Sequence, residues 1–595
     1  MIISLSEYYY TNRFIPASTD PTILKVVKVS ALIFLGLFAF FLDCTHKLLA
    51  YRNITQEKDP LNLSNLKETP HSAEKIQSTP PIVEQISIET HVDKYAMNLA
   101  VQRKTLEKYI LLNNFQVTPE EFFKNLKLFM AEKPINFKLV PVFKEGLFSI
   151  YKHLIKVIES LLKQHSSNEL SNDYEKYTYA IRDLLQTEEY KKNKFSNSIC
   201  LLIQELCFAK FMDTVLTDLQ EKTLENRIKF DPSRNMTLTN ISKWIEEDNR
   251  ILRKLPKGVR QSFSLNCEKA CNAAGINSDQ LSSANIPELR SVHKVKWGII
   301  ESYDVYYIRY PTPTIETTKS FCARITRNNA TVIAPEFLGF LDSIQRKKIR
   351  FLYVNHQYMD KKGNGFLLSA DNNRAEAIQR LEETYTEVFY FLSLPFDGPT
   401  IEEIDKKNLA KWKENLVDNV IGEKEGFRIP KKFREFATSK REEIEHLLNK
   451  LLSLYFSGKS EFNKIERRVL LVIFYSYLKE YFKSEYQIRI MASVCKDNKD
   501  RGNVSACIDE VLFNLRLGKE KDQQTLKDLH LRILSPFIFR NEGIVEHRLQ
   551  FLTDLLNHIA KLDDDQKEKI RAFKVNEQYQ IVDQWISRSN DGIIV

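Results

Sequence analysis

Two patterns of hydrophobic residues divide the chain. From residue 91 to residue 289, apolar side chains recur at the spacing of one helix face, as in Leu147, Tyr151 and Leu154, which predicts amphipathic helices. Beyond that point, short runs rich in β-branched and aromatic residues predict strands. The predicted strands cover residues 295–300, 303–310, 349–355, 387–394 and 488–494. Because helical patterns separate these strands, we predict an α/β domain.

Helical segments surround the last predicted strand. Residues 440–456 and 464–482 precede it, and a helix from about Asn503 to Leu517 follows it. The segment 464–482 is apolar on nearly every face, so we expect it to be buried against the sheet. The remaining predicted helices cover residues 374–384, 522–533 and 546–561, and the charged stretch from residue 562 onward is predicted to cap the domain.

The N-terminal part has a different composition. Residues 23–43 contain the hydrophobic maximum, which is long enough to span a bilayer; a signal peptide and a buried core helix are the alternatives. Residues 44–90 are rich in Pro, Ser, Thr, Asn, Glu and Lys, which predicts a disordered linker. The predicted organisation is therefore an N-terminal segment (1–22), a transmembrane helix (23–43), this linker, an all-α domain (91–230) and a C-terminal α/β catalytic domain (231–595).

Composition and charge narrow the classes of function. Of the 595 residues, 28% are charged, and glycine and proline are scarce, as in a folded, helix-rich protein. A net charge of +9 is modest for this length; it fits attraction to anionic lipid and gives no reason to expect nucleic acid as a partner. The eight cysteines form no CxxC pair and no His/Cys spacing typical of zinc. We therefore expect neither a metal nor a cofactor.

The strand at 488–494 leads into a polar loop that begins at Cys495 and ends at Arg501, followed by Gly502 and a helix. This is the layout of a cysteine-dependent phosphatase loop. Backbone N–H groups of the loop and the helix N-terminus attract an oxyanion, and the same positive field is expected to lower the thiol pKa of Cys495. In such a loop we expect the thiolate to be the nucleophile, Arg501 to bind phosphate oxygens, and Asp500 to protonate the leaving oxygen and later activate water.

The sequence Cys495-Lys496-x-x-Lys499-Asp500-Arg501 resembles the loop of phosphoinositide phosphatases with a Cys-Lys-x-x-Lys-Asp-Arg core. These include the inositol polyphosphate 4-phosphatases and secreted bacterial effectors of the SopB and SidF type. The resemblance covers the loop and its flanks. It implies that Lys496 and Lys499 favour a phosphorylated inositol ring over phosphotyrosine, that the partners are phosphoinositides in anionic membranes, and that the protein is membrane-associated and secreted by a bacterium into a host cell.

The loop departs from that family at several positions. Gly502 stands where its members usually carry Thr or Ser, whose hydroxyl helps the thiolate to leave. Asp497 and Asn498 replace small residues and are included, with Gly502, among the predicted substrate-binding residues. Two alternatives stay open: a protein tyrosine phosphatase, and a non-catalytic helical scaffold in which the motif is degenerate.

Other polar residues follow strand ends, where active-site groups collect in α/β folds. Asp397 follows the strand at 387–394 and is the alternative general acid to Asp500. The triplet Asn355–Gln357 follows another strand, and we place His547 and Arg548 near the site as a hypothesis. Two basic clusters, at residues 346–350 and 431–434, fit either contact with anionic lipid or a solvated face.

Overall fold

The computed structural model describes residues 124, 141–163, 167–194, 200, 221–226, 228, 231, 234–254, 288–297, 302–316, 331–359, 370–398, 401, 409–457, 459, 461–496, 498–536, 543–577 and 579–586. All of them belong to a compact unit made of Asp93–Thr317 and Ala330–Val595. The predicted N-terminal segment, transmembrane helix and linker lie outside the described residues, and the predicted domain boundary near residue 230 stays a prediction. In the part of the chain that is described, no helix is long and apolar enough to cross a bilayer.

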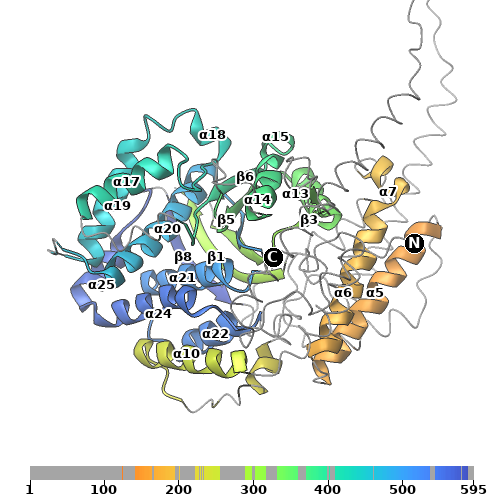
Figure 1. Cartoon of the computed structure of the whole chain (residues 1–595), viewed down its shortest axis with the longest axis horizontal. Coiled ribbons are helices and arrows are strands. Elements are labelled where there is room, and N and C mark those ends of the chain that lie inside the picture. The colour runs from red at the N-terminus through yellow and green to blue at the C-terminus, as the bar shows by residue number, and fades with distance from the viewer. Residues whose placement is uncertain are drawn as a thin grey trace, which may run out of the picture. The chain divides into compact units, whose positions relative to one another are not determined.

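A mixed sheet with strand order β6-β5-β7-β2-β1-β8 lies at the centre of the described structure (Figure 1). Strands β6, β5, β7 and β2 run parallel, whereas β1 is antiparallel to both β2 and β8. A second, two-stranded sheet pairs β3 with β4. The strands are β1 (Glu288–Trp297), β2 (Tyr303–Arg309), β3 (Thr314–Glu316), β4 (Thr331–Ile333), β5 (Phe351–Asn355), β6 (Phe389–Ser393), β7 (Ile490–Val494) and β8 (Tyr579–Ile586).

Every residue of β5, β6 and β7 is buried because helices cover both faces of the sheet. Alternate side chains point to opposite faces. Phe351 and Phe391 join a core cluster with α13 and α14, whereas Leu352 and Leu392 join the cluster that contains α19, α20, α21 and α24. The predicted strands at 349–355, 387–394 and 488–494 are thus confirmed as the buried parallel centre of the sheet.

The helices are distributed over these two clusters and a helical pair at one side (Figure 1). Residues of α13, α14 and α15 lie in one cluster with the sheet, and those of α10 and α17 to α25 in the other. The bounds are α5 (Pro141–Leu162), α6 (Ser167–Gln186), α7 (Glu188–Asn193), α10 (Leu238–Lys254), α13 (Pro335–Arg346), α14 (Ala370–Gln379), α15 (Leu381–Thr384), α17 (Leu409–Ile421), α18 (Lys431–Arg434), α19 (Arg441–Tyr455), α20 (Lys464–Tyr486), α21 (Arg501–Arg516), α22 (Gln523–Leu534), α24 (Glu546–Lys561) and α25 (Asp564–Ala572).

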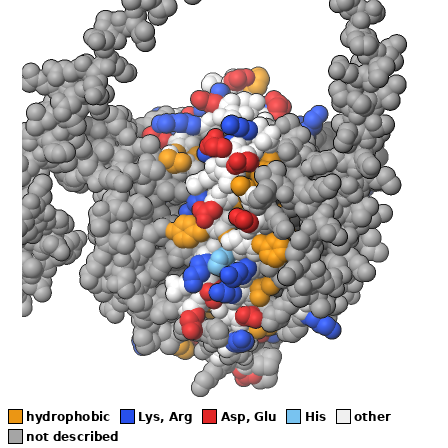
Figure 2. Space-filling view, turned by 90° about the vertical axis from the view of Figure 1, so that its right-hand side faces the viewer, with side chains coloured by type: hydrophobic (Ala, Val, Ile, Leu, Met, Phe, Trp, Pro, Cys, Tyr) orange, Lys and Arg blue, Asp and Glu red, His pale blue; other side chains and the backbone are white. Residues whose placement is uncertain are grey.

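Helices α5 and α6 pack against each other, and α6 is tied to α13 by a buried ion pair. Arg182 donates to both carboxylate oxygens of Glu336, at 3.1 and 2.5 Å. Figure 2 faces the side on which α5 and α6 lie, and its coloured side chains include both charge signs side by side. This visible strip therefore carries mixed charge and does not form a basic surface.

Helix α20 confirms the prediction that the apolar segment 464–482 forms a helix buried against the sheet, although its first turn is exposed. It begins with a capping box, in which Asn463 and Glu466 each bind the other's backbone N–H, and it ends at Gln487 in a left-handed conformation. All residues from Val469 to Ser484 are buried. Its lack of a polar stripe follows from this position between the sheet and the outer helices.

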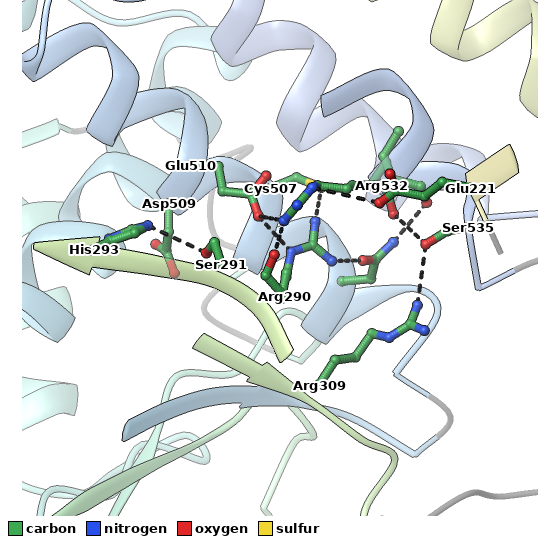
Figure 3. Close-up of polar contacts among 12 residues, drawn as sticks. Glu221, Arg290, Ser291, His293, Arg309, Cys507, Asp509, Glu510, Arg532 and Ser535 are labelled. Carbon is green, nitrogen blue, oxygen red and sulfur yellow. Dashed lines mark hydrogen bonds and ion pairs between the residues drawn. The ribbon is translucent and has the colours of Figure 1, made fainter. Parts of the chain in front are cut away.

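Helix α21 is also buried along nearly its whole length, and neighbouring elements contact several of its polar side chains (Figure 3). Arg290, on β1, donates to Glu510 at 2.7 Å, to Asn503 at 2.5 Å and to the sulfur of Cys507 at 2.7 Å. Burial raises the pKa of the Cys507 thiol to about 12, so this cysteine is neutral. Arg532, on α22, ion-pairs with Glu510 at 3.5 Å. The network joins α21 to β1 and α22.

The opposite side of α21 is joined to α20 by a second buried pair. Lys479 donates to Asp509 at 2.5 Å and to Ser505 at 2.9 Å. Burial lowers the pKa of Lys479 and raises that of Asp509. Both shifts reflect the free-energy cost of removing the charged form of each side chain from water. Helix α21 is therefore held on two sides by directional contacts as well as by its apolar residues.

Two regions differ from the sequence-based expectation. Strand β1 begins at Glu288, where the helical pattern was expected to continue to residue 289, and it is longer than the predicted strand at 295–300. The C-terminal stretch, predicted to be only a charged cap, contains α25 and then β8. Both differences have one cause: β1 and β8 pair with each other over most of their length, and that distant partner stabilises each as a strand.

Candidate active site

Cys495 lies at the carboxyl end of β7, the strand between β5 and β2 in the parallel part of the sheet. It is 2% exposed. The loop that follows ends at Asp500, the N-cap residue of α21, and Arg501 is the first residue of that helix. The predicted succession of strand, loop and helix is therefore present, with the helix beginning at Arg501 and not at Asn503. Parallel sheets place ligands at this edge.

Residues that follow the neighbouring strands hold the start of the loop. The backbone N–H of Thr312, after β2, donates to the carbonyls of Cys495 at 3.1 Å and Lys496 at 3.3 Å. The N–H of His356, after β5, donates to the carbonyl of Val494 at 2.9 Å. The position of Cys495 is thus set by backbone contacts from both sides.

The triplet Asn355, His356 and Gln357 is wholly buried beneath this loop. Gln357 donates to the hydroxyl of Thr312 at 2.8 Å, and the Nδ1 atom of His356 lies 2.8 Å from the carbonyl of Leu394. Burial holds the pKa of His356 well below its usual value, so its imidazole is neutral and donates from Nδ1. We assign these residues to support of the loop.

Gly502 lies where the first turn of α21 passes close to the end of β7 and to the loop. A Cβ atom at this position would come within 2.6 Å of the backbone carbonyl of Ser493 and would also clash with the side chain of Asn498. Asn498 itself is buried and has a positive φ of 48°. The Thr or Ser that the resembling enzymes carry here therefore does not fit this loop, which explains the departure at Gly502.

Replacing Gly502 with alanine should destabilise the fold by about 1–3 kcal/mol, the usual cost of overpacking, and should weaken phosphate binding because the loop must shift. Chemical denaturation and calorimetric phosphate titration measure the two effects. Gly518→Ala, at the other end of α21, is the matched control: its φ of 71° makes it strained, but its Cβ would approach Arg571 no closer than 3.5 Å. It should lose stability and keep phosphate binding. Unchanged stability in Gly502→Ala would contradict the close approach.

Two arginines and two aspartates meet above the loop and form what we call the arginine–aspartate cluster. Arg501 donates to Asp397 at 2.6 Å. Arg548, on α24, donates to Asp397 at 3.2 Å and to Asp500 at 3.0 Å. The second oxygen of Asp500 accepts the backbone N–H of Val545 at 3.1 Å. The cluster thus joins residues that follow β6 and β7 to the start of α24.

The structure brings most of the predicted site residues together. Cys495, Lys496, Lys499, Asp500 and Arg501 share one loop, with Lys496 half-buried and the others buried. Among the described residues of the loop and the cluster, two carboxylates, Asp397 and Asp500, stand against the basic residues Lys496, Lys499, Arg501 and Arg548, a balance that favours binding of an anion. Asp497 lies outside the described residues.

Sequence reasoning located some of these groups and missed others. The structure places the alternative acid Asp397 and the hypothetical neighbour Arg548 in the cluster, whereas His547 is exposed on α24. Thr312 and Val545 were not predicted. Each acts through its backbone N–H, which every residue but proline carries, so no side-chain pattern marks them.

The residues described here supply a thiol, guanidinium groups and carboxylates. In the described part of the chain, no group of three or more His, Cys, Asp or Glu residues is arranged to hold a metal ion. Comparison of the chain with models of protein families, with curated proteins and with solved structures found no match. The functional assignment therefore depends on the loop, its neighbours and their chemistry.

Proposed function

We propose that this protein is a phosphoinositide phosphatase that removes a phosphate from the inositol ring through a phosphocysteine intermediate. One observation carries the proposal: Cys495 directly follows a buried central strand, and Arg501 begins the buried helix that follows the same short loop. A thiol and a guanidinium at the two ends of such a loop fit nucleophilic attack on a bound phosphate.

In the proposed reaction, the thiolate of Cys495 attacks phosphorus and the bond from phosphorus to the ring oxygen breaks. Asp500 gives its proton to the departing oxygen. Water then attacks the phosphocysteine, the S–P bond breaks, and Asp500 accepts the proton of that water. Arg501 binds the phosphate oxygens in both steps. Because Asp500 contacts Arg548 and Val545, proton donation requires that one of these contacts opens.

The loop lysines support an inositol phosphate as the substrate. We expect Lys496→Met or Lys499→Met to lower kcat/KM for phosphoinositide vesicles about ten- to a hundredfold, the worth of a charged hydrogen bond. The rate on a phosphotyrosine peptide should change much less, because its phenyl ring carries no second phosphate. Lys569→Met, an exposed lysine on α25 paired with Asp565, is the matched control. Equal losses on both substrates would contradict the role in ring recognition.

The choice of general acid makes a separate prediction. Asp500→Asn should slow formation of the phosphocysteine from a phosphoinositide about a hundredfold or more, but should slow the same step with p-nitrophenyl phosphate little, because that leaving group needs no proton. Pre-steady-state burst assays of both substrates with Asp500→Asn and Asp397→Asn measure this step apart from the hydrolysis of the phosphocysteine, in which Asp500 also acts. If Asp397→Asn shows the dependence on leaving group and Asp500→Asn does not, the acid is Asp397.

The proposed substrate is a membrane lipid, so the protein has to act at an anionic membrane surface. The resemblance to secreted bacterial effectors extends the proposal to a host membrane. Sedimentation of the full chain with vesicles containing phosphoinositide tests this step, and binding no stronger than to neutral vesicles would count against it.

A further inference from the structure

The carboxylate of Asp397 occupies the position between two guanidinium groups of the arginine–aspartate cluster. Its Oδ2 atom accepts from Arg501 at 2.6 Å and from Arg548 at 3.2 Å, and its Oδ1 atom lies 3.4 Å from Arg548. Paired guanidinium groups that hold two oxygens of one anion form the arrangement that proteins use to bind carboxylate and phosphate alike. Asp397 thus stands where an oxyanion ligand would bind.

The two sides of this contact differ in how firmly they are held. The side chain of Asp397 is 29% exposed, whereas that of Arg501 is 9% exposed. Asp397 follows Phe396, which is buried, and precedes Gly398, whose φ is 90°. The carboxylate can therefore turn into solvent by side-chain rotation, while the more deeply buried Arg501 stays in place.

Arg548 connects the same anion position to the loop. Its guanidinium is 18% exposed and reaches Asp397 with one nitrogen and Asp500 with the other. If a phosphate takes the place of the Asp397 carboxylate, Arg548 is within reach of it without leaving Asp500. Its position on α24, far along the chain from the loop, gives the site a second guanidinium group beside that of Arg501.

We propose that Asp397 is an internal anion that occupies the phosphate position, that a phosphomonoester dianion displaces it, and that Arg548 is then the second phosphate-binding side chain. This inference rests on the proposed function for the identity of the ligand, a phosphate carried by an inositol lipid. The inference adds a competition between two anions for one position. Because phosphate has to displace the Asp397 carboxylate, the affinity of the wild-type protein for phosphate is lower than that of a protein without this carboxylate.

Calorimetric titration of the full chain with inorganic phosphate tests the exchange. Asp397→Asn and Asp397→Ala should both bind phosphate about tenfold more tightly than wild type, since a charged hydrogen bond no longer has to be broken. Asp418→Asn is the matched control, because Asp418 forms a 2.6 Å ion pair with Arg441 at another position, and it should bind phosphate as wild type does. Equal affinity in wild type and both Asp397 variants would overturn the proposal.

A second pair of variants isolates Arg548. Asp397→Asn combined with Arg548→Gln should bind phosphate about tenfold more weakly than Asp397→Asn alone, whereas equal affinity would remove Arg548 from the site. Titration with a soluble inositol phosphate headgroup in place of inorganic phosphate should preserve both differences. Thermal melting of each variant, which reports folding directly, excludes global unfolding as the cause of a lost signal.

The outcomes separate this inference from the function on which it rests. Tighter phosphate binding by the Asp397 variants, together with no phosphate release from any phosphoinositide by wild type, would support the exchange and overturn the proposed enzyme. Phosphate release by wild type, together with unchanged affinity in the Asp397 variants, would support the enzyme and overturn the exchange.

Discussion

Cys495→Ser should abolish phosphate release from phosphoinositides and retain phosphate binding. Serine is nearly the same size as cysteine and keeps the backbone contacts that position residue 495, from Thr312 and within the loop. Its hydroxyl is a far poorer nucleophile than a thiolate at neutral pH, since it stays protonated. The expected result is a rate at the background of the assay, with binding of inorganic phosphate and thermal stability close to those of wild type.

Cys507→Ser is the matched control for that variant. Cys507 is also buried, in α21, but its thiol contacts Arg290 and is kept neutral by burial, which raises its pKa to about 12. It should therefore retain most of its phosphate release. Loss of activity in Cys507→Ser, together with full activity in Cys495→Ser, would show that the nucleophile is Cys507 and that our assignment of Cys495 is wrong.

Arg290→Met should destabilise the fold by about 3–5 kcal/mol, the usual cost of breaking a buried ion pair from one side. Methionine fills much of the volume, but Glu510 loses its partner at 2.7 Å and Asn503 and Cys507 lose theirs. Because these residues all lie on α21, the loss should also loosen the helix that begins at Arg501. Denaturant unfolding of wild type and variant measures the change.

Two further variants test whether the loss of stability in Arg290→Met comes from the buried charge of Glu510. Combining Arg290→Met with Glu510→Gln should recover part of the lost stability, because the carboxylate left without Arg290 is then neutral. Arg441→Met removes an arginine that is 35% exposed in its pair with Asp418, and it should cost less than about 1 kcal/mol. Equal losses in Arg290→Met and Arg441→Met would contradict the role of the buried network.

The sequence predicts the centre of the fold well because each element there has a clear hydrophobic pattern within its own segment. Strands β5, β6 and β7 are continuous apolar runs, and both faces of each are buried. Helices α19, α20, α22 and α24 begin and end within a few residues of the predicted positions. In these elements the hydrophobic pattern agrees with the tertiary position, and α20 and α22 also begin at N-cap residues whose side chains bind the first turn, so local reasoning suffices.

The strands β1 and β8 show where local reasoning ends. Each is stable as a strand because it pairs with the other, and they are separated by most of the described chain. The segment Tyr579–Ile586 does contain β-branched and aromatic residues, which was a usable signal. The charged residues that precede this segment, which belong to α25, make the whole C-terminal stretch resemble a polar cap and mask the signal for a strand.

The candidate site divides in the same way. The cysteine loop is contiguous, so its residues could be assigned from their order. The arginine–aspartate cluster could be predicted only in part. Asp397 follows a strand end and Arg548 was a hypothesis, but their contacts with Arg501 could not be predicted, because the three residues come from separate elements and no spacing rule relates them. The reason for Gly502 was also inaccessible, since it depends on the approach of Ser493 and Asn498 in space.

The most direct test of the central claim is position-resolved phosphate release from a panel of phosphoinositide vesicles by the full chain, beside Cys495→Ser. The account predicts that wild type removes phosphate from a defined position of the inositol ring and that Cys495→Ser releases none. Equal release by both proteins, or none from any lipid by wild type, would contradict the assignment of Cys495 as the nucleophile of a phosphoinositide phosphatase.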